Sequence, residues 1–259
     1  MISKIMSLNT AHAHGGVVIY NGERILLYCD GVEFALDGAV PAFKGNKKGR
    51  IYLTTHRVIF TNKDFKALLQ SFSIPFYCMK EVELEQPVFG ANYIKGRVVA
   101  EEGGNWTGSC KFKLWFNSGG CIEFGQAMLR AGQLASRNRM QQPPPPYVPP
   151  QGPYYQAPPS NYAAPQNYAW VPYQTFPSAP PPEYVYMTEA PPPYPGVDPN
   201  YTPYPPPPQH NGHMSAADAK AQEANNSAYY NPATPHNVYV PATASAPPPP
   251  YSEFEKKNN

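Results

Sequence analysis

Proline is confined almost entirely to one side of this chain, and no other feature limits its folding as strongly. Of the 35 prolines among 259 residues, 32 follow residue 140. Proline fixes φ near −65° and removes a backbone donor, so it interrupts both helices and sheet ladders. The stretch 141–259 also has few Leu, Ile or Val residues to offset the entropy of folding. We therefore predict a disordered, Pro/Tyr-rich tail over 141–259, a folded domain over 15–140 and a flexible N-terminus over 1–14.

One short pattern recurs four times in this tail: two prolines, any residue and then tyrosine. The first to fourth motifs are Pro144–Tyr147, Pro181–Tyr184, Pro191–Tyr194 and Pro248–Tyr251. Their candidate binding residues are Pro144, Pro145, Tyr147, Pro181, Pro182, Tyr184, Pro191, Pro192, Tyr194, Pro248, Pro249 and Tyr251. Consecutive prolines favour the extended polyproline II form before any partner arrives, so little ordering entropy remains to be lost on binding. Such a rod offers prolines to an aromatic-lined groove and a tyrosine ring to a neighbouring pocket, which is the chemistry of a ligand.

Chance is the competing explanation for these motifs, because the tail is rich in both residues. One copy would fit chance, whereas four copies favour a binding role. The second motif differs from the others by carrying Glu183, which could select different partners. Tyr184 and Tyr194 are ten residues apart, so a tandem partner could engage both and gain avidity.

Charge also divides between the two parts. Residues 1–140 hold 17 Lys and Arg against 11 Asp and Glu, whereas residues 141–259 hold 3 against 7. Neither imbalance approaches the dense basic clustering that indicates direct nucleic acid binding. No apolar run has the length of a signal peptide or a membrane span, so we expect an intracellular protein.

The folded part shows the alternation and turn signals of a β-rich domain. Strands are predicted at Val17–Tyr20, Ile25–Tyr28, Val32–Leu36, Arg50–Thr54, Arg57–Thr61, Ser71–Pro75, Met79–Leu84, Ile94–Ala100, Cys110–Phe116 and Cys121–Phe124. Asn21-Gly22 and Asp30-Gly31 favour tight hairpins between the first of these strands. From Gly125 the period becomes helical, with Met128, Ala131 and Leu134 on one face. Strands followed by one helix predict a curled sheet capped by that helix.

Two runs in this domain resemble a known family. The run Lys48–Phe60, followed by Ser71–Phe76, resembles the signature of GRAM domains, which share the pleckstrin-homology-like barrel. With Gln86–Gly96 and Ala228–Pro232, the chain resembles the WW-domain-binding protein 2 family, to which a sperm postacrosomal sheath protein is related. The resemblance implies a mainly β, pleckstrin-homology-like domain capped by a C-terminal α-helix and followed by a tail whose motifs bind WW domains.

The same resemblance implies a biological role. It points to an adaptor and transcription coactivator in the cytoplasm and nucleus, with Yes-associated regulators, Nedd4-type ubiquitin ligases and nuclear hormone receptors as partners. The sperm relative implies an alternative role in egg activation, but this tail lacks the Tyr-Gly-x-Pro-Pro repeats of that relative. Phosphorylation of a motif tyrosine would place about two negative charges in a pocket shaped for a phenol, and we expect it to prevent binding at that copy.

A third alternative is a peripheral membrane protein. Lys44, Lys47, Lys48 and Arg50 lie beside a strand loop and could attract a phosphoinositide headgroup. The competing interpretation is a solvated loop that aids solubility. His56 and Arg57 are expected to end or line a strand rather than to bind a ligand. We find no catalytic spacing, phosphate-binding loop or metal-ligand cluster, so no enzyme activity, cofactor or metal is predicted.

Overall fold

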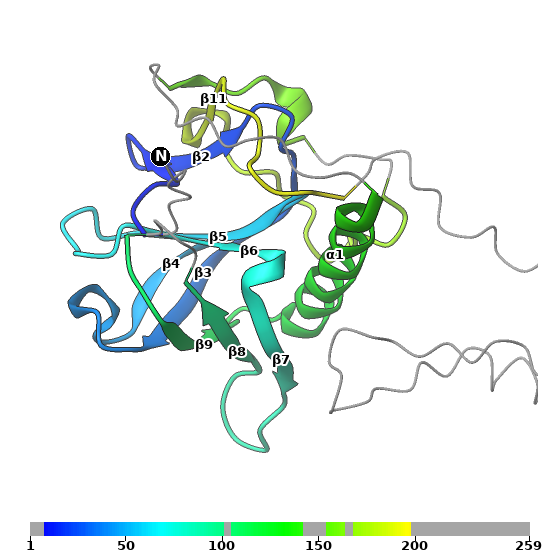
Figure 1. Cartoon of the computed structure of the whole chain (residues 1–259). Coiled ribbons are helices and arrows are strands. Elements are labelled where there is room, and N and C mark those ends of the chain that lie inside the picture. Colours follow the sequence, from blue (N-terminus) through cyan, green and yellow to red (C-terminus); the bar gives the residue numbers. More distant parts are fainter. Residues whose placement is uncertain (1–7, 101–104, 142–153, 164–167, 198–259) are drawn as a thin grey trace, which may run out of the picture. The chain divides into compact units, whose positions relative to one another are not determined.

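The computed structural model describes residues 8–100, 105–141, 154–163 and 168–197 (Figure 1). All of these residues belong to one compact unit, Met1–Pro205. The first and fourth motifs and the Ala228–Pro232 run lie outside the described residues. The second and third motifs lie inside them, so the structure shows what surrounds two of the four copies.

Seven antiparallel strands form the larger sheet, in the spatial order β6-β5-β4-β3-β9-β8-β7. The strands are β3 (Ile25–Asp37), β4 (Lys47–Thr54), β5 (Arg57–Asn62), β6 (Ser71–Pro75), β7 (Met79–Glu85), β8 (Tyr93–Val99) and β9 (Ser109–Trp115). Period-two patterning produces this sheet, because alternate side chains point to opposite faces. Along β9, Cys110, Phe112 and Leu114 are buried, whereas Lys111 and Lys113 between them are exposed. The predicted mainly β, pleckstrin-homology-like fold is confirmed.

The core of this sheet is aromatic. The Phe34 ring lies 4.8 Å from that of Phe60, 6.0 Å from Phe72 and 6.5 Å from Phe112, measured between ring centroids. All four rings are almost fully buried. Tilted aromatic pairs at these distances add packing energy to the hydrophobic contribution of the buried area. This core holds the strands that carry the functional residues described below.

Helix α1 (Cys121–Gln141) closes the domain and packs against β7 and β8. Its buried positions follow helical spacing: Phe124, Ala127, Met128, Ala131, Leu134 and Ala135. The helix begins four residues earlier than expected, so the predicted strand at Cys121–Phe124 is wrong. Gly119 and Gly120 have φ values of 86° and 82°, and the Phe124 amide already donates to the Gly120 carbonyl at 3.0 Å. The left-handed glycine pair therefore turns the chain directly into the helix.

A second, four-stranded sheet joins the N-terminal residues to the tail. Its order is β1-β2-β11-β10, and β11 runs parallel to β2 beside it in Figure 1. The strands are β1 (His12–Ala13), β2 (Gly16–Tyr20), β10 (Tyr155–Gln156) and β11 (Val185–Thr188). Every residue of β2 is buried, as expected for a strand with partners on both sides. Residues far apart in the sequence thus share one sheet.

This sheet corrects two of the domain boundaries. The disorder predicted over 141–259 does not hold for 154–163 and 168–197, where the tail pairs with β2 and packs on the domain. Tyr168 and Val171 join the main core, which gives these segments the apolar burial that the tail composition lacks on average. The flexible N-terminus predicted over 1–14 likewise fails from Leu8 onward, because Leu8 is buried and bridges Phe72.

Both predicted hairpins near the start of the domain are wrong. Asn21-Gly22 connects β2 to β3, which belong to different sheets. Asp30-Gly31 lies inside β3, a single strand of 13 residues whose pairing with β4 shifts by one residue between Asp30 and Val32. Gly31 has a φ of 72°, so the turn signal is used as a bulge that bends one long strand.

Candidate functional site

The second and third motifs lie at the two ends of β11. β11 pairs with β2 in register, Val185 with Val17 and Met187 with Ile19. Beyond β11, the Asn21 amide donates to the Ala190 carbonyl at 3.0 Å. The backbone between the two motifs is therefore fixed to β2, and each motif occupies a defined place on the domain.

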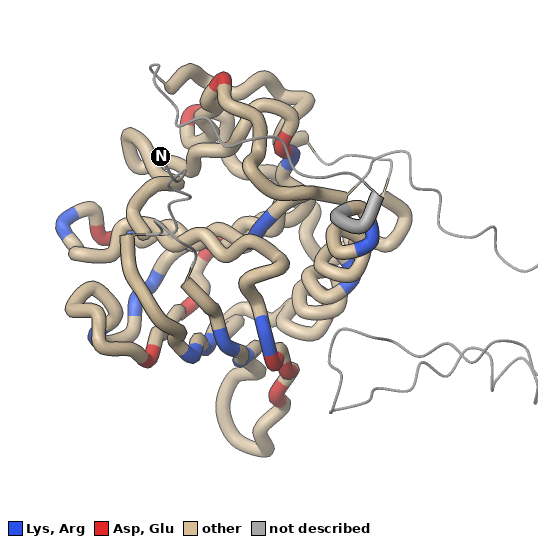
Figure 2. The backbone as a smooth tube through the Cα atoms, in the orientation of Figure 1, with Lys and Arg blue, Asp and Glu red and all other residues tan. Residues whose placement is uncertain are grey.

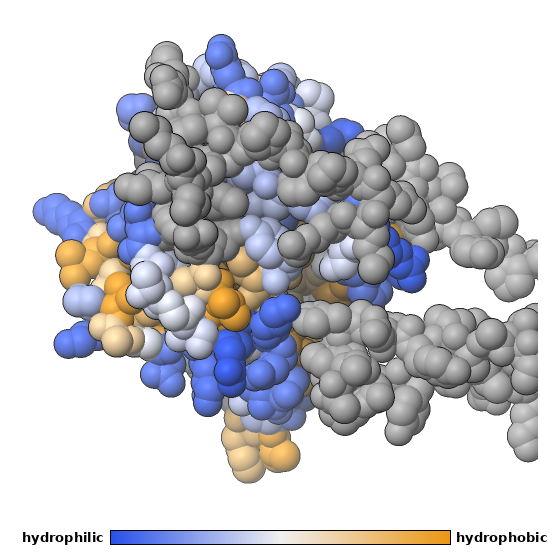
Figure 3. Space-filling model, viewed as in Figure 1, coloured by the Kyte–Doolittle hydropathy of each residue, from blue (hydrophilic) through white to orange (hydrophobic). Residues whose placement is uncertain are grey.

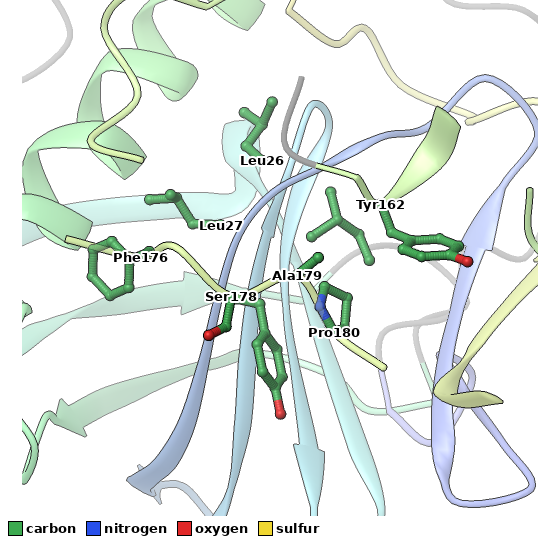
Figure 4. Close-up of a pocket in the computed structure, with 9 residues that line it drawn as sticks. Leu26, Leu27, Tyr162, Phe176, Ser178, Ala179 and Pro180 are labelled. Carbon is green, nitrogen blue, oxygen red and sulfur yellow. The ribbon is translucent and has the colours of Figure 1, made fainter. Parts of the chain in front are cut away.

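The tail reaches β11 by packing across the start of β3. Figure 4 shows Phe176, Ser178, Ala179 and Pro180 passing beside Leu26 and Leu27, where they line a cavity of about 10 Å³. Such a space holds about one water molecule and is too small for an organic ligand. The Phe176 ring also contacts Phe124 of α1 edge-on, at 6.0 Å between centroids. This stretch therefore anchors the tail and is not a ligand pocket.

The second motif is a tight turn rather than a polyproline II rod. Pro182–Tyr184 forms a 3-10 helix in which the Tyr184 amide donates to the Pro181 carbonyl at 3.0 Å. Proline fixes φ but leaves ψ free, so the same residues are compatible with both conformations. The Tyr184 ring is half-buried, and the Arg50 guanidinium lies 4.8 Å from its centroid. Arg50 also faces Asp30, with 3.7 Å between Nε and Oδ2.

Gly16 of β2 allows the second motif to approach the sheet. A Cβ atom at Gly16 would lie 2.3 Å from the Tyr184 carbonyl oxygen, a distance that no packed side chain tolerates. The backbone of Tyr184 thus rests directly on β2, whereas its ring stays at the domain surface. This motif is held by main-chain packing and by one cation–π contact.

The third motif is buried more deeply. Tyr194 is only 3% exposed, and three rings surround it: Tyr20 of β2, Tyr77 of the short helix Phe76–Cys78, and His56 between β4 and β5. Their centroids lie 6.2 Å, 5.9 Å and 6.3 Å from that of Tyr194. We refer to Tyr20, His56 and Tyr77 as the Tyr194 site. Three separate elements supply it, so it exists only in the folded domain.

A buried ion pair supports the Tyr194 site. Arg57, the first residue of β5, donates from Nε and Nη2 to the two Glu23 carboxylate oxygens at 2.9 and 3.0 Å. Its remaining bonds go to Ser73 Oγ and the Val18 carbonyl, both at 3.0 Å, and its guanidinium lies 4.4 Å from the Tyr20 ring centroid. The bidentate geometry and the additional acceptors offset the cost of burying both charges.

Electrostatics around this pair follow from burial and proximity. Burial has the largest single effect on the pKa of Glu23 and would raise it, but the Arg57 charge and the hydrogen bonds from Arg57 and Thr54 together outweigh burial, so the pKa is lowered. Burial would lower the pKa of Arg57, but Glu23 raises it. Burial lowers the pKa of His56 to about 4, an effect that Arg57 reinforces and Glu23 opposes. The ion pair is thus charged and His56 neutral at neutral pH.

Residues after the third motif hold it in place. Asn138 of α1 donates from Nδ2 to the Gly196 carbonyl at 2.7 Å, and the Val197 amide donates to the Thr55 carbonyl at 2.8 Å. The Val197 side chain is buried in the main core. A Cβ atom at Gly196 would lie 2.3 Å from His56 Nε2, so glycine is required for this approach. We call Gly196 and Val197 the clasp.

The four basic residues of the predicted lipid site do not form one surface. Lys44 and Lys48 are exposed. Lys47 is buried, and its Nζ donates to the carbonyls of Phe43, Lys44 and Gly45 at 2.9, 2.9 and 2.6 Å. Burial lowers the pKa of Lys47. Arg50 contacts Asp30 and Tyr184, and Figure 2 shows acidic residues interspersed with basic ones along the backbone.

An apolar surface lies at the loop between β7 and β8. Val88 and Phe89 are each 91% exposed, and Figure 3 shows this apolar tip projecting beyond hydrophilic strands. An exposed apolar pair can mark an interaction surface. Nothing among the described residues indicates what would cover it, so it does not define the site.

Other kinds of site were sought in the same part of the chain. Across residues 8–100, 105–141, 154–163 and 168–197, no cluster of three or more His, Cys, Asp or Glu side chains could hold a metal ion. No helix within those ranges has the length and apolar character to cross a membrane.

Pattern reasoning located the two described motifs but not the residues that receive them. Tyr20, His56, Tyr77 and the Glu23–Arg57 pair come from separate elements, and no spacing in the sequence connects them. His56 was expected to end or line a strand, and it lies in the turn between β4 and β5; Arg57 opens β5 as expected. The available signal was Val185-Tyr186-Met187-Thr188, a proline-free run of strand-forming residues inside the tail.

The chain is similar to several known proteins. The GRAM domain family matches residues 20–133. WW domain-binding protein 2 of Homo sapiens is 46% identical over 268 residues, covering 92% of this chain and 94% of that protein. The postacrosomal sheath WW domain-binding protein of Bos taurus is 41% identical over 138 residues, covering 51% of this chain and 44% of that protein. Among solved structures, the Vps36 N-terminal PH domain matches with a TM-score of 0.36 and 16% identity, covering 53% of this chain and 94% of that one.

Proposed function

Because the chain belongs to the WW domain-binding protein 2 family, we propose that it is a non-enzymatic adaptor that binds WW domains through its Pro-Pro-x-Tyr motifs. The observation that carries this proposal is the extent of the similarity. A match over 92% of the chain includes much of the tail as well as the GRAM domain. The tail contains four copies of a motif whose prolines and tyrosine suit an aromatic-lined groove.

The adaptor role extends to partners and place of action. We propose Yes-associated regulators and Nedd4-type ubiquitin ligases as WW partners, a coactivator role with nuclear hormone receptors, and action in both cytoplasm and nucleus. The sperm role in egg activation is less favoured, because the postacrosomal sheath relative matches only 51% of this chain. Phosphoinositide binding is also less favoured, since Lys47 uses its ammonium group within the fold.

The proposed function is tested by titrating the full chain with a panel of single and tandem WW domains. A variant with Tyr147, Tyr184, Tyr194 and Tyr251 all changed to Ala removes every motif tyrosine. Tyr204→Ala is the matched control, because Tyr204 lacks the two-proline spacing. We expect micromolar or tighter binding that the fourfold change abolishes and the control preserves. Equal binding by all three proteins would contradict the proposal.

A further inference from the structure

We propose that the Tyr194 site, Tyr20, His56 and Tyr77, is a binding site for a Pro-Tyr peptide. In this chain the third motif occupies it, so the site competes with WW domains for Tyr194. The competition rests on the proposed WW-binding function, whereas the binding site stands on the contacts of the domain itself. The ligand class is a short segment with the pattern Pro-Pro-Pro-Tyr-Pro-Gly followed by an apolar residue, as in 191–197.

Because the Tyr194 ring is buried, the Tyr194 site and a WW domain cannot bind the third motif at the same time. Tyr194 is 3% exposed and lies among three rings. A WW domain takes the motif tyrosine into its own aromatic-lined groove, which requires the same ring. One phenol cannot occupy both sites, so a WW domain can bind the third motif only after it leaves the domain.

The Tyr194 site has the features of a preorganised receptor. Tyr20 is fixed by β2 and by the guanidinium of Arg57, which is itself held by Glu23. The Glu23 carboxylate also accepts a hydrogen bond from the Tyr20 amide at 2.8 Å. Aromatic rings held in one orientation lose little entropy when a ligand ring packs on them. The supporting network thus prepares the aromatic surface for its ligand.

The domain also binds the main chain on both sides of the motif. Before the motif, Asn21 donates to the Ala190 carbonyl, and after it Asn138 donates to the Gly196 carbonyl. The Val197 amide completes the set by donating to Thr55. These bonds satisfy backbone groups that would otherwise be buried without partners, and they define the direction of the bound segment.

The clasp explains why the third motif is selected. The second residue after its tyrosine is Gly196, which lies against the His56 ring where a Cβ atom has no room. In the first, second and fourth motifs the corresponding residues are Pro149, Tyr186 and Glu253. None of these side chains fits that approach, so the site discriminates one motif from the other three by a residue outside the shared pattern.

The test compares one motif in two settings. A full chain with Tyr147, Tyr184 and Tyr251 changed to Ala retains only the third motif. Its affinity for a single WW domain is measured beside that of a free synthetic peptide of residues 188–199. Because the apparent affinity falls with the fraction of competent molecules, we expect the chain to bind about tenfold or more weakly than the peptide.

Gly196→Val is the decisive variant, because the added side chain has no room beside the His56 ring. The Pro-Pro-x-Tyr pattern itself stays unchanged. In the chain the substitution should raise WW affinity to nearly that of the free peptide, and in the free peptide it should change nothing. Asn138→Ala is an independent second variant that removes one backbone contact and should give a smaller gain. Thermal unfolding confirms that each variant remains folded.

The outcomes separate this inference from the proposed function. If the free peptide fails to bind any WW domain, the proposed function fails at this motif. Direct binding then tests the site: a labelled 188–199 peptide should bind the Tyr194→Ala/Gly196→Val chain and shift the His56 ring resonances. Equal WW affinity of chain and peptide, or no binding of the labelled peptide to that chain, would overturn the inference.

Discussion

The second and third motifs share one pattern and one short stretch of chain, yet the domain treats them differently. Tyr184 is half-buried at the surface under Arg50, in a motif that forms a 3-10 turn. Tyr194 is enclosed by three rings above a buried ion pair. The difference comes from flanking residues, since Tyr186 follows Tyr184 at the position that Gly196 holds after Tyr194. The pattern therefore identifies a ligand, whereas its surroundings determine how available that ligand is.

The largest expected effect is on the ion pair beneath the Tyr194 site. Glu23→Ala leaves the Arg57 charge buried without its partner, and we expect a loss of about 3–5 kcal/mol in the free energy of unfolding. Urea denaturation of the full chain measures it. Glu83→Ala is the control, because its ion pair with Lys95 is exposed to solvent and should contribute far less to the free energy of unfolding. Similar losses for the two variants would show that the pair is not the support described.

Removing each tyrosine in turn sharpens the comparison between the motifs. Tyr194→Ala empties the Tyr194 site and should lower the free energy of unfolding by about 2–3 kcal/mol, somewhat less than for a core aromatic because the tail can detach. Tyr184→Ala loses mainly one cation–π contact and should cost about 0.5–1 kcal/mol. Urea denaturation of both variants provides the measurement. Equal losses in the free energy of unfolding would contradict the deeper burial of Tyr194 than of Tyr184.

Protonation of His56 should destabilise the packing of the third motif on the domain specifically. The folded pKa is about 4 and the ordinary value is 6.5, so the unfolded or detached form binds the proton more readily. Stability is complete above pH 6.5 and falls as the pH decreases towards 4, by about 1.4 kcal/mol at pH 5.5. Glu23 and Arg57 keep their charge states over this range, because the pKa of Glu23 is lowered and that of Arg57 raised.

Unfolding measured at pH 7.0 and 5.5 checks this expectation, with His56→Gln as the comparison. In His56→Gln, most of the decrease in the free energy of unfolding between pH 7.0 and pH 5.5 should be absent. A residual slope is expected from His12, whose pKa is also lowered by burial. An unchanged pH dependence in His56→Gln would exclude His56 as its source.

The smallest expected effect is a change in WW affinity at the second motif. Arg50→Gln removes the guanidinium from the Tyr184 ring, a contact that contributes about 0.5–1 kcal/mol. In a chain that retains only the second motif, we expect WW affinity to rise about two- to fivefold. The same change in a chain that retains only the third motif should leave WW affinity unaltered. A gain at the third motif instead would mean that the two motifs are released together.

Much of the fold followed from local pattern. Alternation predicted the strands from Arg50 to Phe116, and helical spacing predicted most of α1. The failures occurred where strand pairing is long-range. β2 lies outside the larger sheet and pairs with β11, about 170 residues later in the chain. Average tail composition hid Val185–Thr188, because a proline-rich segment was judged as a whole. A four-residue strand can form inside such a segment when a buried edge accepts it.

The candidate site was predictable only in part. Two prolines and a tyrosine at fixed spacing identified the ligand residues, since that pattern is local. The Tyr194 site was not predictable, because Tyr20, His56 and Tyr77 come together only when β2, the β4–β5 turn and the Phe76–Cys78 helix fold. The spacing of the predicted basic cluster also did not show that its members are divided: Lys47 alternates to the opposite face of β4 from Lys48 and donates to backbone carbonyls.

Hydrogen exchange at the Val197 amide tests the central claim most directly. This amide donates to the Thr55 carbonyl at 2.8 Å and belongs to the third residue after Tyr194. The account predicts that it exchanges far more slowly in the full chain at pH 7 than in the free 188–199 peptide, and that Gly196→Val removes the protection. Exchange at the peptide rate in the unaltered chain would contradict the claim that the domain holds its own motif.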